Sequence, residues 1–422
     1  MHKKFTYKNG LRVITVPMKS TKSVTVFVMC GVGSRHETRD INGASHFIEH
    51  LMFKGTKKRP TTLDISKALD SVGAEFNAAT SKDWTGYYVK IDSKKVELAL
   101  DVLSDMLSNS KFDKKEIDRE RNVIVEEINM YHDNPMMYVE DVLEQIMYKG
   151  STLGWEIAGP RKTIKEIPRS KLIAYRDKYY IPENTVVCIA GNIDSKIEAL
   201  VKKYFNTTKE VPNETEGFKP FEFTQDKPQV KLVYKKTEQV QLALGFPGYS
   251  SFDDRVYAKY LLSVILGGNM SSKLFIAVRE RKGLAYFVRS YVNVYQDTGN
   301  FIVQSGLDKS RLEMAIKIIL AELKKIKSKG VTADDLQKAK EYLRGKTALG
   351  LEETSNIADL YVKQELLQGK IMSPDQKLKK FDAVTAKEIQ AVAKEMFDKD
   401  LVSLAIIGPF KDEKKFLELL KI

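Results

Sequence analysis

The sequence repeats its own organisation at an interval of a little over 210 residues. The strand-like run that starts at Gly86 stands before an apolar helical pattern, and the run that starts at Gly299 holds the same place 213 residues later. A buried-strand pattern around Gly191 is likewise matched 217 residues later around Gly408, and a short amphipathic helix pattern follows each. A shared interval over separate features indicates duplication. The sequence therefore predicts two duplicated α+β domains.

The length supports the same division. A chain of 422 residues is longer than one hydrophobic core usually serves. Residues 206–228 are polar and proline-rich, which is typical of a linker. We therefore expect an N-terminal domain at residues 1–205, a linker at 206–228 and a C-terminal domain at 229–422. In each domain we expect a mostly antiparallel sheet covered by helices.

Composition argues against several classes of protein. Apolar residues make up 43% of the chain and charged residues 30%, as in a soluble globular protein, and no apolar run reaches membrane-spanning length. The net charge of +13 comes from lysines scattered among acidic neighbours, so we expect neither a nucleic-acid nor a membrane partner. We expect no signal peptide. Cys30 and Cys188 lie in apolar strand patterns and are predicted to be buried free thiols, which indicates a reducing, cytoplasmic location.

The pentapeptide His-Phe-Ile-Glu-His, which begins at His46, carries the strongest chemical signal. On a helix, positions i, i+3 and i+4 share a face, so His46, Glu49 and His50 project together. Two neutral imidazoles can bind a catalytic zinc, and the carboxylate beside them can take a proton from zinc-bound water. The order is H-x-x-E-H, the inverse of the zincin motif. Ser45 or Asn42 is expected to cap this helix. The alternative is an ordinary helix with two histidines, so a third ligand is needed.

A second helix offers that ligand. The pattern at residues 113–131 predicts a helix with a capped start, and Glu120 and Glu127 lie on one otherwise apolar stripe of it. Two carboxylates on such a stripe are costly to bury unless a positive group meets them. A zinc ion meets that need if one glutamate is the third ligand and the other supports the site. The alternative is that the stripe is a helix edge on which Arg119 and Arg121 pair with the glutamates.

The motif at residues 46–50, followed by the segment Glu-Arg-Asn-Val-Ile-Val-Glu-Glu at residues 120–127, resembles the family of pitrilysin, insulin-degrading enzyme and mitochondrial processing peptidase. The resemblance covers nearly the whole chain and points to the short, single-chain, processing-peptidase-like bacterial type. Family members are zinc endopeptidases whose two duplicated domains form half of an enclosed chamber. Their distal glutamate ligand follows the second histidine after roughly 75 residues, which leaves Glu126 and Glu127 in range. The family's Glu-x6-Glu pairing implies Glu127 as the ligand and Glu120 as its support.

The second domain contains no histidine and carries other features. Arg279 and Tyr286 match an Arg-x6-Tyr pair that, in active family members, faces the zinc across the chamber. The resemblance implies that Arg279 binds a peptide carbonyl and that Tyr286 donates a hydrogen bond to the oxyanion. Arg281 is a near competitor for the arginine role. The glycine-containing turn at residues 266–275 matches no phosphate-binding loop and is expected to be a plain turn.

The resemblance implies peptide hydrolysis, with one Zn²⁺ per chain and Glu49 as the base that activates zinc-bound water. The run Phe76-Asn77-Ala78-Ala79 is similar to the family's edge strand, onto which the substrate adds as an extra strand, and Asn77 is the expected positioning side chain. Because backbone pairing reads little sequence, extended and unfolded peptides are the expected substrates.

A homodimer is also expected. In the family the two domains of one chain pack side by side, so Arg279 and Tyr286 would act in trans on the metal domain of a second copy. The competing hypothesis is a non-catalytic scaffold or assembly subunit of the same fold. Family members of that kind usually lose ligands, whereas every ligand position is filled here.

Overall fold

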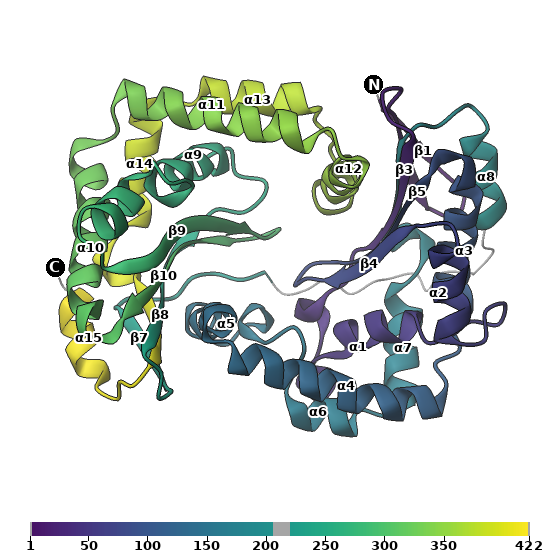
Figure 1. The fold of residues 1–422 in the computed structure, drawn as a ribbon, viewed down its shortest axis with the longest axis horizontal. Helices are drawn as coiled ribbons and strands as arrows, with labels where there is room; N and C mark the ends of the chain where they lie inside the picture. The colour runs from purple at the N-terminus through teal and green to yellow at the C-terminus, as the bar shows by residue number, and fades with distance from the viewer. Residues whose placement is uncertain (1, 206–219, 421–422) are drawn as a thin grey trace. The chain divides into compact units, whose positions relative to one another are not determined.

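The computed structural model describes residues 2–205 and 220–420 and contains two β-sheets with helices packed on them (Figure 1). Residues 206–219, the larger part of the predicted linker, lie outside the described residues. The strands are β1 (Lys3–Thr6), β2 (Arg12–Pro17), β3 (Ser23–Cys30), β4 (Glu75–Thr80), β5 (Thr85–Asp92), β6 (Thr185–Gly191), β7 (Gln229–Tyr234), β8 (Gln239–Gly248), β9 (Ala285–Val294), β10 (Gly299–Asp308) and β11 (Ser403–Gly408).

The α-helices account for most of the remaining chain. They are α1 (Ala44–Met52), α2 (Thr62–Asp70), α3 (Val96–Asn109), α4 (Lys114–Asp133), α5 (Pro135–Met147), α6 (Arg161–Glu166), α7 (Arg169–Tyr179), α8 (Ile197–Phe205), α9 (Val256–Gly267), α10 (Leu312–Lys329), α11 (Ala333–Gly350), α12 (Thr354–Gln368), α13 (Pro374–Ala383), α14 (Ala386–Met396) and α15 (Glu413–Leu420). A short π-helix, η6 (Phe275–Glu280), precedes β9. Within the described residues, no helix combines the length and the apolar composition that a membrane span requires.

The first sheet has six strands in the order β1-β2-β6-β3-β5-β4. β2 and β6 are parallel, and every other neighbouring pair is antiparallel. β3 and β6 are almost fully buried because both faces of the sheet are covered, which explains their continuous apolar sequences. β4 forms one edge of the sheet and alternates exposed with half-buried residues.

Successive residues of β3 enter different layers. Val24, Val26 and Val28 join the core that α1, α3 and α7 also fill. Phe27 and Met29 point to the opposite face, where α12 packs on β3 and β6. Both cysteines are buried and free, as the sequence predicted, and they lie in these two layers.

The second sheet has five strands in the order β7-β11-β8-β10-β9. Only β7 and β11 are parallel. One face packs on α9, α10 and α14, and the other packs on α5, which lies against β8 and β11. This arrangement repeats that of the first sheet, in which a single helix also covers the second face.

Local details repeat as well. β5 ends at Asp92, whose carboxylate accepts a hydrogen bond of 2.9 Å from the backbone N–H of Lys94 just before α3 begins. β10 ends at Asp308, whose carboxylate accepts a hydrogen bond of 2.8 Å from the N–H of Ser310 just before α10 begins. The predicted duplication, the α+β class and the mostly antiparallel sheets are confirmed.

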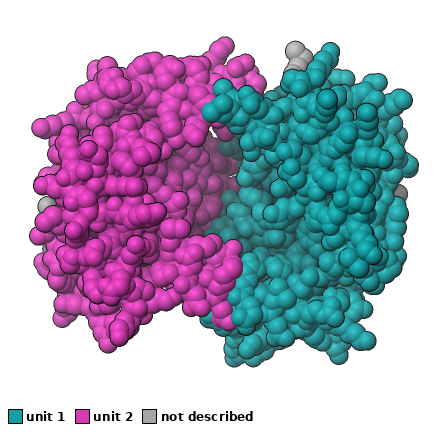
Figure 2. Space-filling view, viewed as in Figure 1, with its two compact units in different colours: residues 1–128, 155–218, 348–371 teal, residues 129–154, 219–347, 372–422 magenta. Residues whose placement is uncertain are grey.

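The chain forms two compact units, coloured separately in Figure 2. The first contains residues 1–128, 155–218 and 348–371, and the second contains residues 129–154, 219–347 and 372–422. Each unit therefore includes a helix from the other half of the sequence: α12 belongs to the first unit and α5 to the second.

Candidate metal centre

α1 carries the histidine motif and begins after a glycine. Gly43 has a φ of +100°, and a Cβ at this position would lie 2.6 Å from the carbonyl oxygen of Ala158, so only glycine fits without strain. The carboxylate of Glu37 accepts hydrogen bonds of 2.7 Å from the backbone N–H groups of both Gly43 and Ser45. It therefore satisfies donors that the helix itself leaves unpaired. The expected cap by Ser45 or Asn42 is wrong, and Asn42 instead donates to Glu37 at 2.9 Å.

Three side chains of the first unit converge on one point. The Nε2 atoms of His46 and His50 lie 3.3 Å apart, and Oε2 of Glu127 lies 3.6 Å from the first and 3.3 Å from the second. His46 is buried, whereas His50 and Glu127 are half-buried. Within the described residues, this is the one cluster of three histidine, cysteine or acidic side chains whose donor atoms could hold a single metal ion.

The spacing of these three atoms fits a zinc ion. With zinc–donor bonds of about 2.0–2.1 Å, the donors of a tetrahedral site lie about 3.3–3.4 Å from one another. The observed separations of 3.3, 3.3 and 3.6 Å match that triangle. Two imidazole nitrogens and one carboxylate oxygen also form a donor set that zinc prefers, and they leave a fourth tetrahedral position open.

Glu120 supports the cluster from behind. Its Oε2 lies 3.0 Å from Nδ1 of His50, and its Oε1 lies 2.7 Å from the ammonium nitrogen of Lys54. The hydrogen bond to Nδ1 fixes the ring orientation that directs Nε2 toward His46 and Glu127. Lys54 was not predicted, because it lies two residues beyond the end of α1 at Met52, where the helical period no longer places a side chain.

Arg119 and Arg121, the alternative partners for Glu120 and Glu127, pair with other groups. Arg119 pairs with Glu116 at 2.9 Å. The guanidinium of Arg121 donates to the carbonyl oxygens of Ile164 and Ile167, at 2.6 and 2.7 Å. The stripe that carries the two glutamates therefore faces the histidines rather than these arginines.

Neighbouring charges set the protonation of the cluster. Burial, together with the nearby His50, lowers the pKa of His46 to about 4, so this ring is neutral as a metal ligand must be. Burial also disfavours a charge on His50, but hydrogen bonds to Glu120 and Glu127 outweigh it and raise the pKa of His50 to about 9. The two carboxylates thus favour positive charge at this position, whether a proton or a metal ion supplies it.

The structure also separates the two adjacent glutamates of α4. Glu127 is half-buried and faces the histidines, whereas Glu126 is exposed and takes no part in the cluster among the described residues. The helical period explains this difference, because neighbouring residues on a helix point about 100° apart.

Glu49 lies on α1 between the two histidines and is half-buried. Its Oε2 accepts a short hydrogen bond from the hydroxyl of Thr80, the last residue of β4. Burial raises the pKa of Glu49, and the Thr80 hydrogen bond opposes that shift. Thr80 was not among the predicted site residues, although it directly follows the predicted edge-strand run.

The predicted substrate-binding run lies in β4, at an edge of the first sheet. Phe76 and Ala78 are half-buried, and Asn77 and Ala79 are exposed. β4 pairs with β5 on one side only, so its other side has backbone groups with no strand partner in the sheet. Such an edge can accept an additional strand.

Arg279 and Tyr286 lie together in the second unit. Arg279 belongs to η6, and Tyr286 lies near the start of β9 and is 73% exposed. The guanidinium carbon of Arg279 lies 5.6 Å from the centre of the Tyr286 ring and 5.0 Å from that of Phe275. The competing Arg281 is exposed at the end of η6. The stacking on two rings places Arg279, rather than Arg281, beside Tyr286.

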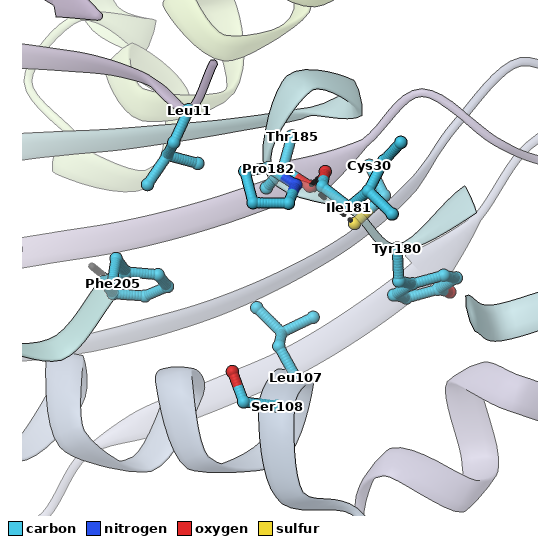
Figure 3. Close-up of a pocket in the computed structure, with 9 residues that line it drawn as sticks. All are labelled: Leu11, Cys30, Leu107, Ser108, Tyr180, Ile181, Pro182, Thr185 and Phe205. Carbon is cyan, nitrogen blue, oxygen red and sulfur yellow. Dashed lines mark hydrogen bonds between the residues drawn. The ribbon is translucent and has the colours of Figure 1, made fainter. Parts of the chain in front are cut away.

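Among the described residues, two further cavities are lined by side chains that do not belong to the cluster. In the first unit, Leu11, Leu107, Ile181 and Phe205 line a small cavity that also touches Cys30 (Figure 3). At about 50 Å³ it is too small for a peptide. In the second unit, a cavity of about 540 Å³ lies between the turn at residues 269–273 and α11. In this turn Asn269 accepts hydrogen bonds from Ser271 through both the backbone N–H and the hydroxyl.

Two family models match the chain. The model described as "Insulinase (Peptidase family M16)" matches residues 12–161, which include the candidate metal centre. The model described as "Peptidase M16 inactive domain" matches residues 166–343. The second match agrees with the absence of histidine from the C-terminal half of the sequence.

Similar proteins match over almost their full lengths. A Bacillus subtilis protein named as the uncharacterized zinc protease YmxG is 38% identical over 97% of this chain and 98% of its own length. A Streptomyces coelicolor protein, also named as an uncharacterized zinc protease, is 37% identical over 97% of this chain and 90% of its own. The crystal structure of a protease from Helicobacter pylori superposes with a TM-score of 0.92 at 27% identity, over 96% of this chain and 99% of that one.

Proposed function

The chain belongs to the M16 peptidase family, and on that premise we propose that it is a zinc-dependent endopeptidase. One observation carries the proposal: His46, His50 and Glu127 present three donor atoms at separations of 3.3 to 3.6 Å. Glu49 lies on α1 together with the two histidines. A proton on His50 alone would satisfy the carboxylates of Glu120 and Glu127, but it would not account for the neutral ring of His46 at the same point. A metal ion uses all three donors.

The proposed roles follow from the position of each side chain. When bound, zinc supplies a Lewis acid and lowers the pKa of a water molecule at the open position. Glu49 takes the proton of the attacking water and passes it to the leaving amine. Glu120 holds the ring of His50, and Lys54 keeps Glu120 charged and in place. One zinc per chain is proposed, because no second cluster of this kind occurs among the described residues.

β4 is the proposed substrate site. An extended peptide that pairs with the free edge of β4 adds one strand to the sheet, and the exposed Asn77 is placed to contact it. Because pairing of this kind uses backbone groups, the proposed substrates are unfolded peptides of varied sequence. Phe76 and Ala78 point to the other face of the strand, where β4 packs on α1.

We further propose a homodimer in which Arg279 and Tyr286 act on the metal domain of the second copy. Arg279 would hold a peptide carbonyl, and Tyr286 would donate to the developing oxyanion. The high exposure of Tyr286 supports a role toward a group outside its own unit. An enclosed chamber between the copies is part of this proposal. The buried free thiols support a reducing, cytoplasmic compartment.

The test is cleavage of long unstructured peptides by the wild type and by Glu49→Gln, each with and without a chelator. Glutamine keeps the shape of the side chain and removes the base. We expect activity to fall by roughly 10²- to 10⁴-fold in the variant while zinc content stays unchanged. Activity should vanish on chelation and return with added zinc. A folded, zinc-loaded wild type that cleaves no peptide would instead favour the scaffold role.

A further inference from the structure

We propose that Thr80 is a positioning residue that aims the carboxylate of Glu49 from the end of the substrate-binding strand. This inference rests on the proposed function. Its basis is one hydrogen bond between two elements that the reaction would use together: Thr80 ends β4, and Glu49 lies on α1. Thr80 donates its hydroxyl proton to Oε2 of Glu49.

The hydrogen bond from Thr80 leaves one oxygen of Glu49 available to act as the base. Among the described residues, Thr80 is the hydrogen-bond donor to the Glu49 carboxylate, and it engages Oε2. The second oxygen, Oε1, therefore remains to receive a proton. A glutamate side chain has three rotatable bonds. Because the hydrogen bond already fixes one oxygen, little further conformational entropy is lost when the side chain reaches its reactive geometry.

Thr80 is itself held rigidly by the hairpin between β4 and β5. The buried side chains of Arg35 and Asp83 form an ion pair of 2.8 Å that ties this hairpin to the loop before α1. At Gly33 in the same loop, a Cβ would lie 2.2 Å from the carbonyl oxygen of Ser81, so the two backbones meet at a distance that only glycine allows. These contacts restrain the backbone of the turn that follows Thr80, so the backbone that carries the Thr80 side chain is held independently of its contact with Glu49.

The consequence concerns substrate and base together. A peptide paired with β4 is placed relative to that strand, and Thr80 places the base relative to the same strand. Because β4 positions both the scissile bond and the Glu49 carboxylate, the two need little movement to reach a reactive geometry. The inference therefore predicts an effect on turnover rather than on substrate binding.

The test compares Thr80→Val, which removes the hydroxyl and keeps the shape, with Thr80→Ser, which keeps the hydroxyl. We expect Thr80→Val to lower kcat by about 10- to 100-fold with little change in KM. Thr80→Ser should stay within a few-fold of the wild type. In a Glu49→Gln background, Thr80→Val should have almost no further effect, because the base that it aims is already absent.

Thr85→Val is the matched control. Thr85 pairs directly with Thr80 across the hairpin, and its buried hydroxyl donates to the carbonyl oxygen of Val32 at 2.8 Å rather than to Glu49. Its loss should lower the melting temperature and leave kcat unchanged. Zinc content and melting temperature, measured on every variant, show whether each still folds and binds the metal.

The outcomes separate the inference from the function on which it rests. An active wild type whose kcat survives in Thr80→Val overturns the inference alone. The inference also fails if Thr80→Ser is as slow as Thr80→Val, or if Thr85→Val is equally slow. A zinc-loaded wild type without peptidase activity overturns the proposed function instead.

Discussion

Nδ1 of His50 lies 3.0 Å from Oε2 of Glu120, on the side of the imidazole ring opposite the candidate metal position. Glu120 is almost fully buried, and its other oxygen pairs with Lys54 at 2.7 Å. Burial disfavours its charge, but the hydrogen bonds from His50 and Lys54 outweigh burial and lower the pKa of Glu120. A charged acceptor behind the ring holds the proton on Nδ1 and leaves Nε2 free to bind a metal.

Glu120→Gln should weaken zinc binding without removing any proposed ligand. The amide keeps the size of the side chain but loses the charge that holds the His50 ring and pairs with Lys54. We expect the zinc affinity to fall by about 10- to 100-fold, as measured by competition with a chelator of known affinity. Glu126→Gln, on the exposed side of the same helix, is the control and should bind zinc as the wild type does. Equal affinities in all three proteins would show that Glu120 has no role at the site.

Glu37→Gln should destabilise the start of α1. The carboxylate accepts three hydrogen bonds, from the backbone N–H groups of Gly43 and Ser45 and from the side chain of Asn42. An amide offers one acceptor oxygen and brings donors against donors, so at least one buried N–H loses its partner. Urea unfolding should show a loss of about 1–3 kcal/mol. Asp40→Asn, an exposed change nearby, should have little effect.

The stability of the wild type relative to Lys259→Met should increase as the pH rises above 7. Lys259 is fully buried, and its ammonium nitrogen lies 3.4 and 3.5 Å from the carbonyl oxygens of Tyr249 and Asn293. Burial lowers the pKa of Lys259 from 10.5 to about 7, and the attraction of Asp253 only partly opposes it. Between these two values the unfolded chain binds the extra proton, so the free energy of unfolding increases with pH.

The measurement is urea unfolding of both proteins at several pH values in the presence of a chelator, which removes the contribution of the metal. The stability advantage of Lys259→Met should be constant below pH 7 and shrink above it, by at most about 1.4 kcal/mol per pH unit. A difference that does not change between pH 7 and 10 would mean that Lys259 titrates normally.

Two inactive variants should restore each other if the proposed homodimer is correct. Glu49→Gln lacks the base but has an intact Tyr286, and Tyr286→Phe has the reverse. When the two chains are co-expressed, each mixed dimer would contain one complete site in trans, so about one quarter of wild-type activity should return. If Arg279 and Tyr286 act within their own chain, or if the active protein is a monomer, the co-expressed mixture should be no more active than each variant alone. Size measurement by light scattering provides the control.

Strong local patterns were enough to locate most elements. The helix expected at residues 113–131 is α4, Lys114–Asp133, and the buried strand expected around Gly191 is β6, Thr185–Gly191. Both have continuous or periodic apolar residues bounded by polar turns, so local preference and burial agree. The expected cap at Ser45 or Asn42 was wrong because the acceptor, Glu37, comes from six residues before Gly43, beyond the reach of a capping pattern.

Other features depend on contacts that a local pattern does not record. α12 packs on the first sheet and α5 on the second, although each is encoded in the other half of the sequence. An apolar helix face shows that a partner is needed, but not which sheet supplies it. Lys54 and Thr80 were missed for a similar reason, because each makes an ordinary polar contact that gains meaning only from Glu120 or Glu49 beside it.

By itself the sequence determined the duplicated α+β plan and the residue types of the candidate site. Its helical period placed His46, Glu49 and His50 on one face, and it placed Glu120 and Glu127 on another helix. Only the tertiary structure decided that the two faces meet, with three donor atoms 3.3 to 3.6 Å apart, and that Glu120 stands behind His50. The physical reason is that periodicity fixes the direction of a side chain within its own helix, whereas the distance between two helices is set by the packing of the core between them.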